Sequence, residues 1–281
     1  MNNTLFIEPK TLKNKCDKPN IKILDATFFL PDSGLNAEEE YKKKHIPNSV
    51  FFDVNKIADP NNPLPHMIPS KEVFSLMMRN LGVNNHDEII IYDNSPLLSS
   101  ARAWFLFRYF GHENIFILNG GLKNWGKNGG EITNKKTIVS TGDFQSKTEK
   151  KSLVVGLTEM ISFSNKNSKL ILDARSHKRF TGEAEEPRPG LLSGHIPNSK
   201  SLPSSELVTN DGFLKSIEEL EKIFSNNNFN KSERIIATCG SGVSACVIAV
   251  ALHCLGRKDV PIYDGSWTEW ASSGQKIKTG I

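Results

Sequence analysis

Short apolar runs alternate with longer amphipathic stretches along this chain. The short runs are rich in isoleucine, valine and leucine, which favours β-strands, and the longer stretches repeat apolar positions at helical spacing. We expect strands at residues 21–26, 89–93, 115–118, 170–174, 234–238 and 260–263, and helices at residues 70–82, 99–111, 216–227 and 243–256. Because helices separate the strands, the pattern predicts parallel sheets covered on both faces.

The whole pattern occurs twice. The segment HIPNS is found at residues 45–49 and again at 195–199, and ILDAT in the first half returns as ILDAR in the second. Residues 111–125 also align with 256–270 without a gap. An offset of about 150 residues is the size of a domain, so it indicates duplication of a whole domain rather than a short structural repeat.

The fold class that these patterns predict is α/β, with two tandem domains. Each domain is expected to be a mainly parallel β-sheet flanked by helices on both faces, one at residues 1–132 and one at 153–281. The interval 133–152 between them is polar, rich in lysine and weakly periodic. Such an interval is typical of a solvated linker.

Composition excludes several classes of protein but does not indicate an activity. The 281 residues carry a net charge of only +4, which gives no reason to expect nucleic acid as a partner. No run approaches the roughly 18 apolar residues of a membrane span. The four cysteines lack a C-x-x-C spacing, the first residues lack a long apolar segment, and arginine is absent from the first seventy residues. We therefore expect a cytoplasmic protein without a zinc ribbon or a secretory signal. The missing arginines argue against a mitochondrial transit peptide, but a mitochondrial location stays open as the alternative.

Cys239 stands where proteins of this fold class place their chemistry. It directly follows the expected strand 234–238, and parallel sheets bind ligands at the carboxyl ends of their strands. Gly240 and Gly242 allow backbone conformations in which successive N–H groups point inward, and the helix expected from about Val243 adds free N–H donors. Such surroundings favour a thiolate, the reactive form of cysteine, and would also hold an anionic adduct such as a persulfide.

Other roles for Cys239 stay open at this point. It could be a buried packing residue or form a disulfide with Cys246, whereas Cys246 and Cys254 lie on an apolar run and are expected to be small core residues. No P-loop string occurs in the sequence. A cysteine phosphatase needs an arginine six residues after its nucleophile, and Ala245 stands there, so phosphoryl chemistry is disfavoured.

The first half of the chain lacks this nucleophile. Asp93 stands at the position that corresponds to Cys239, and the stretch after it contains no glycine. We therefore expect the N-terminal domain to be catalytically inactive. It would serve either as a structural partner or as a wall of an active site built between the domains.

Several segments resemble the rhodanese superfamily over nearly the whole chain: the paired LDA…HIPNS segments, the strand–Cys–loop–helix unit, and the paired GGLKNW and GSWTEW stretches. Within that family, CGSGVSA is similar to the active loop of the 3-mercaptopyruvate sulfurtransferases. Branches that use thiosulfate usually carry basic side chains in this loop, whereas Gly240 and Ser241 are uncharged here. The resemblance implies two tandem rhodanese-like domains with Cys239 as the catalytic nucleophile.

The resemblance also implies which residues bind the substrate. Arg179 and Arg188, nine residues apart, match an arginine pair of the 3-mercaptopyruvate enzymes that binds the substrate carboxylate and keto oxygen. Guanidinium groups suit a small planar anion because they form two parallel hydrogen bonds with a carboxylate, although a solvated charged loop is the alternative. Arg102 matches a third family arginine, for which an interdomain salt bridge is the alternative. The loop residues expected to bind the substrate or the persulfide are Gly240, Gly242, Val243, Ser244 and Ala245.

Proton transfer is implied for Ser241 and His66. The Ser241 hydroxyl could relay a proton or bond the transferred sulfur, although a loop serine that bonds backbone groups is the alternative. His66 matches a family histidine that acts with this serine. The family often has an acid eleven residues before this histidine, but Asn55 stands there, so the sequence does not complete a Ser-His-Asp relay. His45 and His195 occur in both copies of HIPNS, one of which lacks a nucleophile, so we expect them to fix turns.

The resemblance thus implies a two-step sulfur transfer that needs no metal or organic cofactor. Cys239 takes sulfur from 3-mercaptopyruvate as a persulfide, pyruvate leaves, and a thiol acceptor such as thioredoxin, or cyanide, takes the sulfur. Thiosulfate as the donor is the alternative within this enzyme class. A non-catalytic rhodanese-type module that binds or regulates a partner is the alternative outside it. Neither nucleic acid nor a membrane is expected as a partner.

Overall fold

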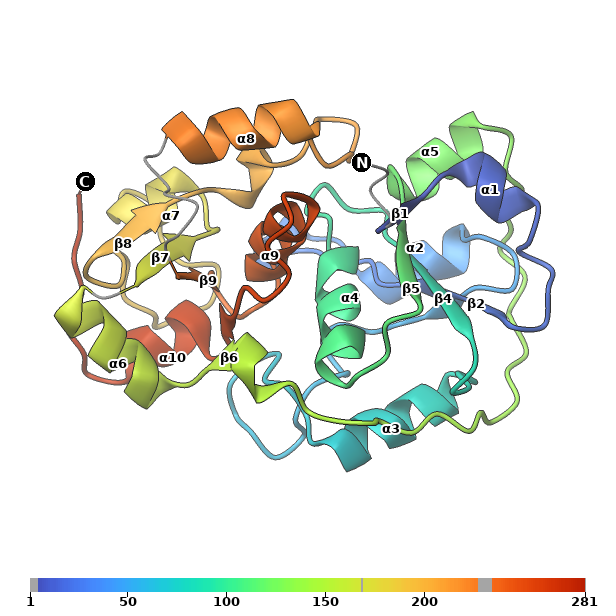
Figure 1. Cartoon of the computed structure of the whole chain (residues 1–281), viewed down its shortest axis with the longest axis horizontal. Coiled ribbons are helices and arrows are strands. Elements are labelled where there is room, and N and C mark those ends of the chain that lie inside the picture. The colour runs from blue at the N-terminus through green and yellow to red at the C-terminus, as the bar shows by residue number, and fades with distance from the viewer. Residues whose placement is uncertain (1–4, 168, 227–233, 281) are drawn as a thin grey trace. The chain divides into compact units, whose positions relative to one another are not determined.

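The computed structural model describes residues 5–167, 169–226 and 234–280. Contacts separate the chain into two compact units, which correspond to its two halves (Figure 1). One short segment of each half belongs to the other unit: residues 62–67 are part of the second unit, and residues 210–213 are part of the first. The interval 133–152 lies in the first unit up to Lys150, and our domain limits stay predictions.

The first unit is built on a parallel five-stranded sheet with the strand order β1-β5-β4-β2-β3. The strands are β1 (Phe6–Ile7), β2 (Ile21–Asp25), β3 (Val50–Phe51), β4 (Glu88–Tyr92) and β5 (Ile115–Leu118). The helices are α1 (Pro9–Lys13), α2 (Ala37–Lys43), α3 (Lys71–Asn80), α4 (Ser100–Tyr109) and α5 (Gly121–Lys127), with a 3-10 helix at Pro31–Ser33. Helices cover the sheet because the central strands β2 and β4 are mostly apolar and buried.

The second unit repeats this architecture with the strand order β6-β10-β9-β7-β8, again all parallel. The strands are β6 (Val154–Val155), β7 (Leu170–Asp173), β8 (Ser199–Ser201), β9 (Ile235–Thr238) and β10 (Ile262–Tyr263). The helices are α6 (Leu157–Lys166), α7 (His177–Thr181), α8 (Ile217–Asn226), α9 (Ala245–Cys254) and α10 (Ser266–Ser272), with 3-10 helices at Lys151–Leu153 and Ser204–Glu206. Each strand thus has the same neighbours as its counterpart in the first unit, as domain duplication requires.

The two sheets confirm the α/β fold class expected from the sequence. Every expected strand is present, but the short strands β1, β3, β6 and β8 were missed because two or three residues carry no recognisable alternation. The expected helices are present and begin one or two residues later than predicted. The one expected over 216–227 ends at Asn226 in α8, and residue 227 lies outside the described residues.

The helix that follows the fourth strand of each sheet is almost fully buried. Helix α4 packs against β4 and β5, and α9 packs against β9 and β10. All residues of α9 from Ala245 to Leu252 are buried, so the loop in front of α9 is tied to a helix that is apolar on all sides. Within the described part of the chain, no helix combines the length and the hydropathy that crossing a bilayer requires.

Both HIPNS segments form a turn, as their repetition predicts. Asn48 and Asn198 have φ angles of 63° and 64°, and a proline before such a residue is typical of a type II turn. The ring of His195 stacks on that of Phe180 at 3.9 Å, and its Nδ1 lies 2.9 Å from the carbonyl oxygen of the same residue. Burial lowers the pKa of His195. The Nδ1 of His45 contacts the carbonyl oxygen of Tyr41 in the same way, so a backbone carbonyl holds each histidine beside its turn.

Candidate active site

Cys239 is the first residue after β9, and the start of α10 holds its backbone. Only 1% of the residue is exposed. Its carbonyl accepts the N–H of Trp267 at 2.9 Å, and its own N–H donates to Oγ of Ser266 at 3.3 Å. The carbonyl of Gly240 accepts both the N–H and the hydroxyl of Thr268, at 3.0 and 2.7 Å. The backbone around the sulfur is therefore fixed by one helix end.

The loop after Cys239 carries backbone donors that no protein group uses. In this loop the N–H groups of five residues donate to no acceptor within the described part of the chain: Gly240, Ser241, Val243, Ser244 and Ala245. All of these residues except Ser244 are buried, and buried N–H groups are almost always paired. Since the loop also runs into the positive end of the α9 dipole, it forms a cradle suited to an anion.

The two glycines of this loop serve different purposes. Gly242 has a φ angle of 77°, in the left-handed region that favours glycine, as expected for a loop that turns its amides inward. A Cβ atom at Gly240 would instead lie 3.0 Å from Nη2 of Arg179. Gly240 thus leaves room for a guanidinium group beside the cysteine. Our expectation that both glycines supply backbone freedom was wrong for Gly240, which has no positive φ angle.

Ser241 and His66 are brought into contact. The Ser241 hydroxyl lies 2.8 Å from Nδ1 of His66, and the two residues are 5% and 3% exposed. His66 comes from the segment 62–67 of the second unit and has a φ angle of 63°, which is uncommon for a residue other than glycine. Backbone strain of this kind clusters at functional sites. The part of both residues in proton transfer stays a prediction.

Arg179, on α7, belongs to a chain of buried ionic groups. Its Nε and Nη2 donate to the Glu186 carboxylate at 3.2 and 2.5 Å. Glu186 also accepts from Nη1 of Arg175 at 2.7 Å, and Asp173 binds Arg175 at 2.6–3.1 Å. Arg175 and Glu186 were missed in the sequence. The sequence does contain one sign of Arg175: the second copy of the repeat reads DAR, with an arginine where the first copy, DAT, has a threonine.

Arg188 completes a positively charged site next to the cysteine. Burial lowers the pKa of Arg188, the neighbouring Arg179 lowers it further, and Cys239 acts in the opposite direction. Arg188 therefore lies in the electrostatic field of both Arg179 and Cys239. Among the described residues no carboxylate forms an ion pair with Arg188. Because an arginine keeps its charge at physiological pH, this guanidinium is available to an external anion.

Arg102 and Asn55 belong to the first unit, whereas Cys239 belongs to the second. Arg102 lies in α4 and is buried. Asn55 is exposed, and its N–H donates to the Asp53 carboxylate at 3.0 Å. The role of Arg102 in substrate binding stays a prediction.

The first unit shows how the same position is used without a cysteine. The carbonyl of Asp93 accepts the N–H of Leu122 at 3.0 Å, as the carbonyl of Cys239 accepts the equivalent amide of α10, which supports the correspondence of the two positions. The Asp93 carboxylate accepts the N–H groups of Ser95 and Ser100 at 3.1 and 3.0 Å. The Asp93 carboxylate thus accepts N–H groups before and at the start of α4, so these donors are not available to a bound anion.

Asp25 ends β2 as Asp173 ends β7, but Thr27 stands where the second copy has an arginine. Asp25 is 1% exposed and accepts the N–H of Thr27 at 2.9 Å. Burial raises the pKa of Asp25 to about 6. The folded chain therefore binds more protons than the unfolded chain between about pH 4 and pH 6, so this group makes the fold less stable as the pH rises through that window.

We expect Asp25→Asn to raise the free energy of unfolding at neutral pH by about 1–3 kcal/mol, because an amide removes the cost of a buried charge. Urea unfolding of both proteins across the pH range checks this. Below about pH 4 the carboxyl is protonated in both states, so the gain should disappear there. A gain of the same size at low pH would contradict the charge argument.

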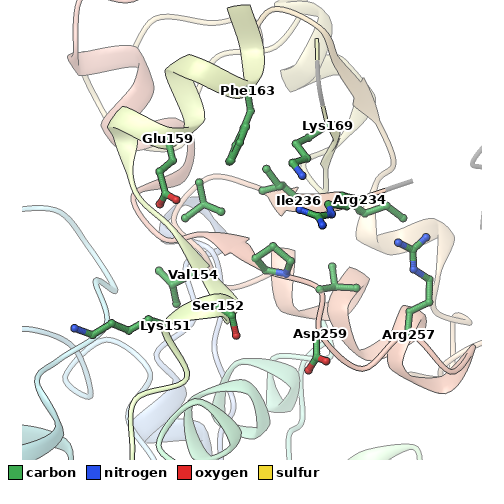
Figure 2. Close-up of a pocket in the computed structure, with 14 residues that line it drawn as sticks. Lys151, Ser152, Val154, Glu159, Phe163, Lys169, Arg234, Ile236, Arg257 and Asp259 are labelled. Carbon is green, nitrogen blue, oxygen red and sulfur yellow. The ribbon is translucent and has the colours of Figure 1, made fainter. Parts of the chain in front are cut away.

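The second unit has a cavity at the end of its sheet where the strands begin, opposite to the end that carries Cys239. It encloses about 690 Å³ and is bounded by the amino ends of β9 and β10 and by α6 (Figure 2). Phe163, Lys169, Arg234 and Asp259 are among its lining residues. Cys239 follows the carboxyl end of β9, so this cavity is separate from the loop that carries the cysteine. Within the described ranges, no three His, Cys, Asp or Glu side chains are placed to share a metal ion.

Comparison with known proteins finds one family twice in this chain. The rhodanese-like domain matches residues 8–128 and again residues 157–273. A 3-mercaptopyruvate sulfurtransferase of Escherichia coli K12 is 40% identical, over 97% of this chain and 96% of that protein. The mitochondrial thiosulfate/3-mercaptopyruvate sulfurtransferase 1 of Arabidopsis thaliana is also 40% identical, over 91% of this chain and 73% of that protein.

Solved structures give the same result. The crystal structure of the Tum1 protein from Saccharomyces cerevisiae has a TM-score of 0.89 at 30% identity and covers 99% of both chains. The crystal structure of SseA from Escherichia coli, described as a 3-mercaptopyruvate sulfotransferase, has a TM-score of 0.85 at 38% identity and covers 94% of this chain and 99% of its own. The similarity therefore extends over both halves.

Proposed function

Since this chain belongs to the rhodanese-like family, with one copy of the domain in each half, we propose that it transfers sulfur from 3-mercaptopyruvate through Cys239. The observation that carries the proposal is the buried cysteine in front of a row of unpaired N–H groups, with Arg179 and Arg188 beside it. A nucleophile, an anion cradle and two guanidinium groups are what an anionic sulfur donor requires.

The two arginines divide the binding of the donor. Arg188 has no carboxylate partner in the described part of the chain, so it can form two hydrogen bonds with the carboxylate of 3-mercaptopyruvate. Arg179 shares its charge with Glu186, so it is better suited to the neutral keto oxygen. Together they would hold the donor sulfur in front of the Cys239 thiolate.

In the first step the Cys239 thiolate attacks the sulfur of 3-mercaptopyruvate. A bond forms between the two sulfur atoms, and the bond from sulfur to carbon breaks. The electron pair of that bond stays with the organic fragment, which leaves as the enolate of pyruvate and takes up a proton. Sulfur remains on Cys239 as a persulfide, whose negative charge the amides from Gly240 to Ala245 stabilise.

We assign the proton to Ser241 and His66, which are 2.8 Å apart. The serine hydroxyl is two residues from Cys239 and can pass a proton from the imidazole to the enolate. Ser241→Ala and His66→Asn should each lower kcat by about 10²-fold, and asparagine tolerates the positive φ angle at position 66. Steady-state release of pyruvate measures this effect. Because the two residues act in one relay, the double variant should lose no more of its kcat than either single variant. A loss in the double variant equal to the product of the two single losses would contradict a shared relay.

The second step returns the cysteine to its thiolate. A thiolate acceptor, such as that of thioredoxin, attacks the outer sulfur of the persulfide, and the bond between the two sulfur atoms breaks. Cyanide can take the sulfur in the same way in a test tube. We further propose a cytoplasmic location, because all four cysteines are free, as is usual in a reducing compartment. Cell fractionation tests this, since one relative is named as mitochondrial.

Thiosulfate is the second candidate donor. A thiosulfate sulfurtransferase of Rattus norvegicus is 37% identical over 90% of this chain. We favour 3-mercaptopyruvate because the loop positions Gly240 and Ser241 carry no positive charge to bind the sulfonate group of thiosulfate. Measuring kcat/KM on both donors tests the proposal. We expect 3-mercaptopyruvate to be preferred by at least about tenfold, and a preference for thiosulfate would overturn the choice of donor.

A further inference from the structure

Ser266 has an unfavourable backbone conformation at the point where α10 begins. Its φ angle is 50°, in the left-handed region that residues other than glycine rarely adopt. The corresponding residue of the first unit is Gly121, with a φ angle of 55°. The copy without a nucleophile thus has a glycine, for which this angle costs little, whereas the copy with the nucleophile keeps a serine.

The hydroxyl of Ser266 links Cys239 to the end of β10. The serine is fully buried, and its Oγ donates to the carbonyl of Tyr263 at 2.8 Å. With its one proton used in that bond, Oγ accepts the N–H of Cys239 at 3.3 Å. In the first unit a Cβ at Gly121 would lie 2.2 Å from the carbonyl oxygen of Asp93, so only the second unit is arranged to admit a serine.

We propose that Ser266 is a positioning residue for sulfur transfer. Its hydroxyl holds the backbone N–H of Cys239, and this contact keeps the sulfur against the free amides of the loop as thiolate and as persulfide. The inference rests on the proposed function, because only a cysteine that carries sulfur through two steps needs a fixed position. A strained backbone conformation persists where surrounding contacts hold it. Here one of those contacts is the hydrogen bond from the N–H of Cys239 to the Ser266 hydroxyl.

Two variants separate the hydroxyl from the strain. Ser266→Ala removes the hydroxyl and keeps the strain, whereas Ser266→Gly removes both. Each should lower kcat on 3-mercaptopyruvate by at least about tenfold and leave KM within about twofold, because donor binding is untouched. The glycine variant should unfold at a higher urea concentration than the alanine variant, since glycine accepts the positive φ angle. As a control, Ser164→Ala removes another buried hydroxyl, that of Ser164 in α6, which donates to the carbonyl of Pro197 at 2.7 Å, and this variant should keep the wild-type kcat.

Hydrogen exchange at the N–H of Cys239 tests the contact without any turnover. We expect this N–H to exchange at least about tenfold faster in both variants than in the wild type. Unchanged exchange, or wild-type kcat in either variant, would overturn the role of Ser266. A fall in kcat matched by a proportional change in KM would also overturn it. A wild-type enzyme that releases no pyruvate would instead overturn the proposed function, so the two failures are distinct.

Discussion

The Cys239→Ser variant is expected to transfer sulfur from 3-mercaptopyruvate with less than roughly one thousandth of the wild-type kcat/KM. A serine hydroxyl stays protonated at neutral pH and forms no persulfide, so the covalent path is lost. A factor of about 10³ corresponds to about 4 kcal/mol of transition-state stabilisation. Since Arg179 and Arg188 are unchanged in this variant, donor binding should survive. Steady-state pyruvate release and inhibition by a donor analogue measure the two effects separately.

Cys16→Ser is the matched control for this variant. Cys16 is a free, partly exposed cysteine of the first unit and lies outside the cradle. Its replacement should leave kcat and KM unchanged. If Cys239→Ser kept more than about a tenth of the wild-type activity, the nucleophile would have to be another group, and the mechanism would be wrong.

Replacing Arg175 by methionine should lower the free energy of unfolding by about 3–5 kcal/mol. The Arg175 side chain is 0% exposed, binds Asp173 and Glu186, and lies over the ring of Trp267 at 4.3 Å. Burial opposes its charge, but the two carboxylates raise the pKa of Arg175 above its ordinary value. Methionine fills much of the space and leaves both carboxylates without this partner in a buried site, where an unpaired charge is costly.

Urea unfolding of Arg175→Met measures this loss. Arg175→Lys keeps the charge but loses the planar guanidinium group, so its urea midpoint should lie between those of the wild type and Arg175→Met. Lys43→Met, which removes an exposed ion pair with Glu40, should leave the midpoint unchanged. A wild-type midpoint in Arg175→Met would contradict a stabilising role for the buried ionic groups.

The parts of this protein that follow from local patterns could be predicted from its sequence. The long apolar strands, the duplication and the place of Cys239 at a strand end depend on neighbouring residues and on one general property of parallel sheets. The short strands at β1 and β6 could not be predicted, because they are too short to show a period. His66 was found only through resemblance, since its contact with Ser241 joins positions far apart in the chain.

The positioning contacts were harder to predict because they join segments distant in sequence. Nothing in the string around Ser266 shows a positive φ angle or a bond to Cys239. Glu186 stands in a run of charged residues that would normally be solvated, yet its side chain is 2% exposed between two arginines. The purpose of Gly240 depends on Arg179, which reaches it from another element. Such contacts become visible only when the folded segments are placed together.

Mass spectrometry of the protein after one equivalent of 3-mercaptopyruvate shows whether Cys239 carries the transferred sulfur. We expect the peptide containing Cys239 to gain the mass of one sulfur atom, and a thiol acceptor to remove it. The Cys239→Ser variant should never gain this mass. Pyruvate release without added sulfur on Cys239 would contradict a persulfide at this residue. A wild-type protein that gains no sulfur and releases no pyruvate would favour a binding module instead of an enzyme.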